Sequence, residues 1–261
     1  MPTEEFIIAL FCRVDEVMGD EPKHPQAKLY PSEVVTLALL YALKGAGERP
    51  FYRWLCRDYR QLFPALPERT RLFRLFTTHR AWAERFLAEP TVLGIADSYG
   101  VELRHPRRHG RVATQLGKKG LSNHRWIAGG KLCVLVNQWG RIVAWAEATA
   151  NVHDSTFHPL IARFEGQTIV LTDGNFHRKV GDPANMKVCG RGTWPQRILV
   201  ETVFSLLTRV CGLNRAGHRA WAAFQAHLAF VVAVFNLLAG WDGLQPDAFG
   251  VTHLALAEFS L

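Results

Sequence analysis

Three acidic residues that lie far apart in the chain could act together on a phosphodiester. Asp97 and Asp173 each follow a short apolar run of the kind that forms a buried strand. Glu201 lies inside another apolar run, Ile198–Phe204, that we expect to be helical. Carboxylates from separate segments can hold two divalent cations roughly 3.5–4 Å apart, which bind the attacking and leaving oxygens together. The pattern therefore indicates metal-dependent cleavage or joining of nucleic acid strands.

This interpretation depends on how the strands are arranged. Asp97 and Asp173 meet only if their strands are adjacent and parallel, with both exits at one edge of a sheet, and if a helix carries Glu201 across that edge. Each acid also has an ordinary explanation. The aspartates could be turn residues, and Glu201 could pair with Arg197, four residues earlier on the same helix face. The joint pattern favours the site, because a carboxylate among valines is costly to bury unless it is paired or bound.

A basic segment between Leu103 and Lys131 contains no acid. Its cations, equal in number to the chain's net charge of +8, are Arg104, Arg107, Arg108, Arg111, Lys118, Lys119, Arg125 and Lys131. A charge run is usually a solvated face. Here the glycines at positions 110, 117 and 120 and the lack of acids favour a loop that holds a phosphate backbone. The pI of about 9.5 agrees with a polyanionic partner.

Further residues could support the same chemistry. Arg191 and Trp194 precede the glutamate helix and offer a cation and a stacking surface for an unpaired base, although Trp194 could equally pack in the core. His153 and Asp154 could orient a metal ligand. A plain turn, in which Asp154 caps a helix running to about Phe164, is the favoured interpretation of that pair. The histidines form no zinc motif, and the cysteines are odd in number and scattered, which indicates a reducing, cytoplasmic compartment.

The chain changes character near Pro90. Residues 1–90 predict an all-α region, with one helix starting near Thr3, a second with Ser32 as its N-cap, and two more over Phe51–Phe63 and Glu68–Leu87. These helices could contact DNA, or pack on the next domain or on a second copy. Residues 91–261 mix strands with helices, including a hairpin of Lys131–Val136 and Arg141–Ala146. We therefore predict an α/β fold, a mixed sheet flanked by helices. The apolar stretch Ala220–Trp241 predicts a core helix, not a membrane span.

Several motifs resemble those of the DDE transposases of bacterial insertion sequences. The matching stretches are IADSYGVEL around Asp97, ATANVHDS at 148–155, LTDGNF around Asp173, RILVETVFSLL around Glu201, the closing GHRAWAAFQAHLAFVVAVFNLL, and the early PSEVVTLALLYAL and FYRWL. The resemblance covers nearly the whole chain. It implies a ribonuclease-H-like catalytic domain over residues 91–261. Only 28 positions separate Asp173 from Glu201, so the resemblance is to the compact type without a large insertion domain.

The resemblance also implies an activity. Asp97, Asp173 and Glu201 would be the catalytic triad, holding two Mg²⁺ ions for which Mn²⁺ substitutes. The enzyme would cleave double-stranded DNA at the terminal repeats of its element and join the ends to target DNA, as a homodimer assembled on DNA in the nucleoid. The alternatives are a ribonuclease-H-like nuclease without strand transfer and a DNA-binding remnant whose catalytic site has decayed.

Many relatives carry the pattern Tyr-x2-Arg-x3-Glu-x6-Lys around the glutamate. Trp194, Arg197 and Glu201 align with its first three positions, while Thr208 stands at the lysine position with Arg209 beside it. The resemblance thus adds Arg197 and Arg209 to the residues expected to contact DNA.

Overall fold

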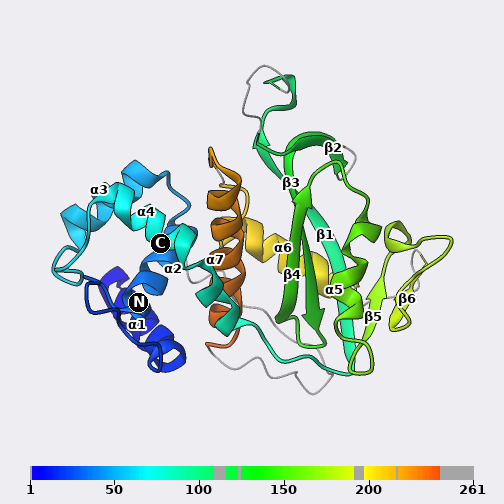
Figure 1. The fold of residues 1–261 in the computed structure, drawn as a ribbon, viewed down its shortest axis with the longest axis horizontal. Coiled ribbons are helices and arrows are strands. Elements are labelled where there is room, and N and C mark those ends of the chain that lie inside the picture. Colours follow the sequence, from blue (N-terminus) through cyan, green and yellow to red (C-terminus); the bar gives the residue numbers. More distant parts are fainter. Residues whose placement is uncertain (1, 109–115, 123–124, 191–196, 216, 242–261) are drawn as a thin grey trace.

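A bundle of helices and a twisted sheet lie side by side, with one long helix between them (Figure 1). The computed structural model describes residues 2–108, 116–122, 125–190, 197–215 and 217–241. Its architecture is mixed α/β, with helices on both faces of a mixed sheet, as the sequence predicts.

The first 90 residues are helical. The elements are α1 (Thr3–Met18), α2 (Pro31–Lys44), α3 (Glu48–Asp58), α4 (Arg69–Thr78) and the 3-10 helix η1 (Arg80–Phe86). The predicted cap of α2 was wrong by two residues: Tyr30 is the N-cap, because Pro31 suits the first helical turn and the Glu33 carboxylate accepts a hydrogen bond from the Tyr30 N–H at 2.7 Å. The single helix expected over residues 68–87 is divided, since two threonines, poor helix formers, end α4.

The strands are β1 (Leu93–Arg104), β2 (Lys118–Ser122), β3 (Arg125–Asn137), β4 (Ile142–Thr149), β5 (Ile169–Thr172) and β6 (Met186–Val188). Their order is β2-β3-β1-β5-β6, and β4 also pairs with β3. β3 runs antiparallel to β1, β2 and β4, whereas β5 is parallel to β1 and β6. The predicted hairpin is confirmed as β3 and β4.

β1 is longer than its sequence suggests. The apolar run predicts a strand that ends at Ala96, but β1 continues to Arg104 because β3 pairs with it from Gly94 onward along its length. Asp97 therefore lies within a strand and not at its exit.

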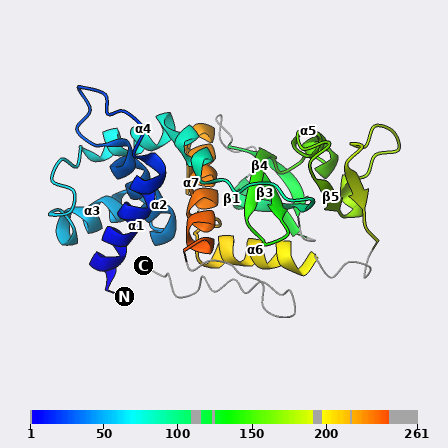
Figure 2. The ribbon, with the colours of Figure 1, turned by 90° about the horizontal axis from the view of Figure 1, so that it is seen from below.

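Helices cover the two faces of the sheet. α6 (Arg197–Arg209) lies on one face, and η3 (Asp154–Phe157) with α5 (His158–Ala162) lies on the other (Figure 2). Alternation along β3 divides its side chains between two core clusters: Val134 packs with the cluster of α6 and the N-terminal helices, and Cys133 with that of α5.

The long central helix, α7 (Trp221–Ala239), joins the bundle to the sheet. Among the described residues it is the helix long and apolar enough to cross a membrane, but 78% of its most apolar window is buried inside the molecule, as a core helix would be. Asn236 on α7 donates to the carbonyls of Phe86 and Ile142, at 2.9 and 2.6 Å. Buried apolar residues of the N-terminal helices, the sheet, α6 and α7 form one cluster, so one core crosses the expected boundary at residue 90, and the division into two domains stays a prediction.

Candidate active site

The two aspartates lie on neighbouring strands. β1 and β5 are parallel, and Ile95 pairs with Leu171, so that Asp97 and Asp173, each two residues further on, stand next to each other. The adjacent, parallel strands that the sequence interpretation requires are present, although only β5 ends at its aspartate, since Asp97 lies within β1. Local hydrogen bonds orient both carboxylates: Asp97 accepts the Ser98 N–H at 2.7 Å, and Asp173, the N-cap of a short 3-10 turn, accepts the Asn175 N–H at 2.9 Å.

The environment of Asp97 disfavours its charge. Burial raises the pKa of the Asp97 carboxyl to about 7, and the negative charges of Asp173 and Asp154 act in the same direction. The Ser98 N–H and the charge of Arg197 oppose this rise without cancelling it. Such crowded carboxylates are the donor set that a hard divalent cation prefers, and a cation there would relieve their repulsion.

Asp154 belongs to a buried ion pair on the opposite face of the sheet. Its Oδ1 atom lies 2.8 Å from Lys131 Nζ and accepts the Ser98 hydroxyl at 2.6 Å. Lys131 also donates to the Val152 carbonyl at 2.9 Å. The expectation that Lys131 belongs to a phosphate-binding loop was therefore wrong, because strand alternation turns its side chain inward. Asp154 does not cap the following helix either: His153 does, its ring accepting the Ser155 N–H at 3.4 Å.

Glu201 is largely exposed and takes part in an ion pair on its own helix. Its side chain is 59% exposed on α6, and its Oε1 atom lies 3.0 Å from Arg197 Nε, as in the alternative interpretation from the sequence. The helix itself is docked beside the aspartates: Phe204 stacks on Tyr99, two residues beyond Asp97, with ring centroids 5.4 Å apart. Within the part of the chain that the structure describes, no three acidic, histidine or cysteine side chains are grouped so as to hold a metal ion.

The cations expected to contact DNA lie on several elements of the second half of the chain. Arg107 lies exposed in the 3-10 turn Pro106–Arg108, which also holds Arg108; Arg104 is half-buried at the end of β1; Lys118, Lys119 and Arg125 are exposed on β2 and β3; and Arg209 is exposed near the end of α6. Arg111, Arg191 and Trp194 lie outside the described residues.

The segment that holds these cations is partly a hairpin and not the loop expected. β2 pairs with the first five residues of β3. A Cβ atom on Gly120 would lie 1.9 Å from the Ala150 carbonyl oxygen, so this glycine allows close backbone packing and does not mark a flexible loop. The Nη2 atom of Arg125 lies 3.6 Å from Oε2 of Glu102, an acid just before the acid-free segment.

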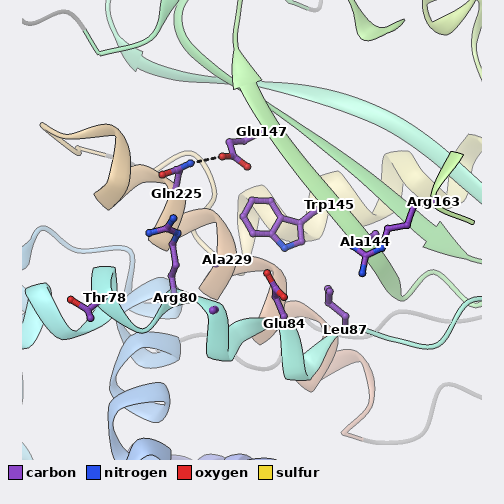
Figure 3. A pocket seen from close by; sticks show the side chains of 11 residues that line it. Thr78, Arg80, Glu84, Leu87, Ala144, Trp145, Glu147, Arg163, Gln225 and Ala229 are labelled. Atoms are coloured by element: carbon purple, nitrogen blue, oxygen red, sulfur yellow. Dashed lines mark hydrogen bonds between the residues drawn. The ribbon is translucent and has the colours of Figure 1, made fainter. Parts of the chain in front are cut away.

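A separate pocket of about 440 Å³ lies between η1, β4 and α7 (Figure 3). Charges of both signs line it, including Arg80, Glu84 and Glu147, and Gln225 donates to Glu147. None of the residues predicted for the catalytic site lines this pocket. The two aspartates therefore lie outside this pocket.

Comparison with models of protein families finds none that matches this chain, and comparison with curated proteins finds none that is similar to it.

Proposed function

We propose that this protein is a DNA transposase of the DDE type, which cleaves the ends of a mobile element and joins them to target DNA. The observation that carries the proposal is the parallel pairing of β1 with β5, which sets Asp97 beside Asp173. The docking of the Glu201 helix on the same face supports it. The mixed strand directions and the helices on both faces support a ribonuclease-H-like identity for the sheet.

Asp97 and Asp173 would hold Mg²⁺, and Glu201 would complete the site by leaving its ion pair with Arg197. Bound cations would stabilise the charge that develops on the phosphate oxygens, and Mn²⁺ would substitute. The chain's own contribution is orientation. The N–H groups of Ser98 and Asn175 fix one oxygen of each aspartate. In the absence of cations, Arg197 supplies positive charge to both Glu201 and Asp97.

The partner would be double-stranded DNA, bound first as terminal repeats and then as target. The exposed cations Arg107, Lys118, Lys119 and Arg125 would neutralise phosphates, so binding would weaken steeply with salt. Assembly on DNA would bring two copies together, and the N-terminal helices would serve either DNA contact or that pairing. The cell compartment would be the cytoplasm, at the nucleoid.

Cleavage of DNA that flanks the protein's own gene tests the proposal. Purified protein is mixed with a supercoiled plasmid that carries this DNA, in Mg²⁺ or Mn²⁺, and nicked, linear and joined products are separated on a gel. Asp173→Asn should abolish cleavage while DNA binding persists. Glu165→Gln removes an exposed acid just beyond α5 and serves as the control. Full cleavage by the Asp173→Asn variant would reject the assignment.

Two further measurements separate the alternatives. Joining of pre-cut ends to a target plasmid distinguishes a transposase from a nuclease that shares its acids. A melting temperature that Mg²⁺ leaves unchanged would favour a decayed DNA-binding remnant, because a ligand that binds only the folded state stabilises it.

A further inference from the structure

The outer end of the β2–β3 hairpin exposes two large apolar side chains. Leu121 and Trp126 are 56% and 58% exposed, and they face each other across the two strands. The Lys119 ammonium lies 4.9 Å from the centroid of the Trp126 ring, within the range of a cation–π contact. The pair therefore forms an apolar tip with a cation held over its aromatic face.

The hairpin holds this tip rigidly. Ile127, the next residue after Trp126, is fully buried, and an added Cβ on Gly100 would collide with it. Gly120, beside Leu121, packs directly against the carbonyl of Ala150. The base of the hairpin is thus fixed to the sheet, and the exposure of the tip is not the result of a loosely attached segment.

The tip faces the same side of the sheet as Asp97. Side chains alternate along β3, so Trp126 shares a face with Val134, which pairs with Asp97. Gly130 lies between them on that face, and the Phe224 ring of α7 occupies the space that a Cβ atom on Gly130 would fill. Eight residues separate Trp126 from Val134. At about 3.3 Å per residue, the tip is on the order of 26 Å from Asp97 along the strand.

The positive charge around the tip favours a polyanionic partner. Lys118 and Lys119 on β2 and Arg125 on β3 are exposed beside it. Hydrophobic side chains among cations are the combination with which proteins wedge between base steps or stack on unpaired bases. A single exposed apolar residue would need no explanation, whereas two that face each other at the tip of a fixed, basic hairpin do.

We propose that Leu121 and Trp126 form a wedge that stacks on an unstacked base of bound DNA, while the neighbouring cations hold the flanking phosphates. This inference rests on the proposed function and specifies how its DNA is held. With an axial rise of about 3.4 Å per base pair, the contacted base would lie roughly eight base pairs from the phosphate at Asp97. Trp126 would thus offer a stacking surface besides the one that the sequence suggests at Trp194, which lies outside the described residues.

Fluorescence anisotropy measures the wedge without cleavage. The probes are a labelled 40-base-pair duplex and the same duplex with a four-nucleotide unpaired bubble, titrated without divalent cations at several salt concentrations. Stacking contributes about 1–3 kcal/mol per base, so Trp126→Ala should weaken bubble binding by about 5- to 150-fold and leave the salt slope unchanged. Trp126→Phe should retain most of the affinity. Lys119→Ala should lower the salt slope by about one.

Trp139 provides the matched control. It is 38% exposed in the turn between β3 and β4, at the opposite end of β3. Trp139→Ala should bind both probes as the wild type does. Equal binding of the bubble by Trp126→Ala and the wild type overturns the wedge, as does an equal loss in both tryptophan variants. If Trp126→Ala lowers the melting temperature, Leu121→Ser replaces it, with the same loss expected.

The two proposals fail separately. A Trp126-dependent preference for the bubble, with no cleavage in Mg²⁺, would keep the wedge and reject the transposase. Cleavage by the wild type with unaltered binding by Trp126→Ala would do the reverse. Trp126-dependent binding to vesicles of anionic lipid, with no preference for the bubble, would also overturn the wedge.

Discussion

Replacing Asp97 with asparagine should stabilise the protein at alkaline pH. The pKa of Asp97 is raised from 3.8 to about 7, first by burial and then by the charges of Asp173 and Asp154. The folded state thus holds the proton more tightly than the unfolded state. The stability that this proton contributes is complete below pH 4 and is lost as the pH rises through 7. At about 1.36 kcal/mol for each pH unit, the full loss is on the order of 4 kcal/mol.

Urea unfolding at pH 5 and pH 8, without divalent cations, measures this loss. Between these values the wild type should lose about 2–3 kcal/mol more of its unfolding free energy than Asp97→Asn does, because part of the loss occurs below pH 5. Glu165→Gln, an exposed acid elsewhere, should follow the wild type. Millimolar Mg²⁺ at pH 8 should then stabilise the wild type more than Asp97→Asn. If Asp97→Asn and the wild type show the same pH dependence, the crowding of charge inferred for this site is refuted.

Three further changes test buried contacts elsewhere in the fold. Lys131→Met should lower the free energy of unfolding in urea by about 3–5 kcal/mol, because it leaves the buried Asp154 charge without a cation. Adding Asp154→Asn should recover much of this loss. Burial lowers the pKa of His227 to about 4, so the fold should lose stability as the pH falls from 6.5 to 4. At pH 5 the His227→Asn variant should lose about 2 kcal/mol less of its unfolding free energy than the wild type, measured from urea unfolding. Gly120→Ala should lower the melting temperature by several degrees, because its Cβ would lie 1.9 Å from the Ala150 carbonyl oxygen. A normal melting temperature in that variant would contradict the close packing of the hairpin.

The sequence predicts where the strands near the site begin better than it predicts how long they are. The apolar run before Asp173 ends at a turn, and β5 ends there too, because the next residues form a 3-10 turn. The run before Asp97 also ends, yet β1 continues for eight more residues. The alternation of Tyr99, Val101 and Leu103 with Gly100, Glu102 and Arg104 is a local sign of a strand, but it does not identify the strand that pairs with these residues. Their extended conformation comes from β3, more than 25 residues away, and a local pattern cannot report that pairing.

The basic segment shows a different limit of sequence reasoning. Counting charges groups Lys131 with Arg125, although their environments are opposite: Arg125 is exposed, and Lys131 is 7% exposed beside Asp154. The glycines at 129 and 130 and the apolar residues that follow mark Lys131 as part of a buried strand. Its partner Asp154 lies in the stretch ATANVHDS, where the sequence gives no sign of an ion pair with Lys131. Only the fold brings these two segments together.

Glu201 shows why the last part of the site is the hardest to predict. Its spacing from Arg197 is that of an ion pair, whereas its apolar neighbours suggest a carboxylate that binds metal. The structure contains the ion pair. The two interpretations are nevertheless linked through Arg197, which pairs with Glu201 and also lowers the pKa of Asp97. A cation bound by the aspartates would repel Arg197 and attract the carboxylate that it holds. The proposed site therefore requires that cation binding by the aspartates release Glu201 from Arg197.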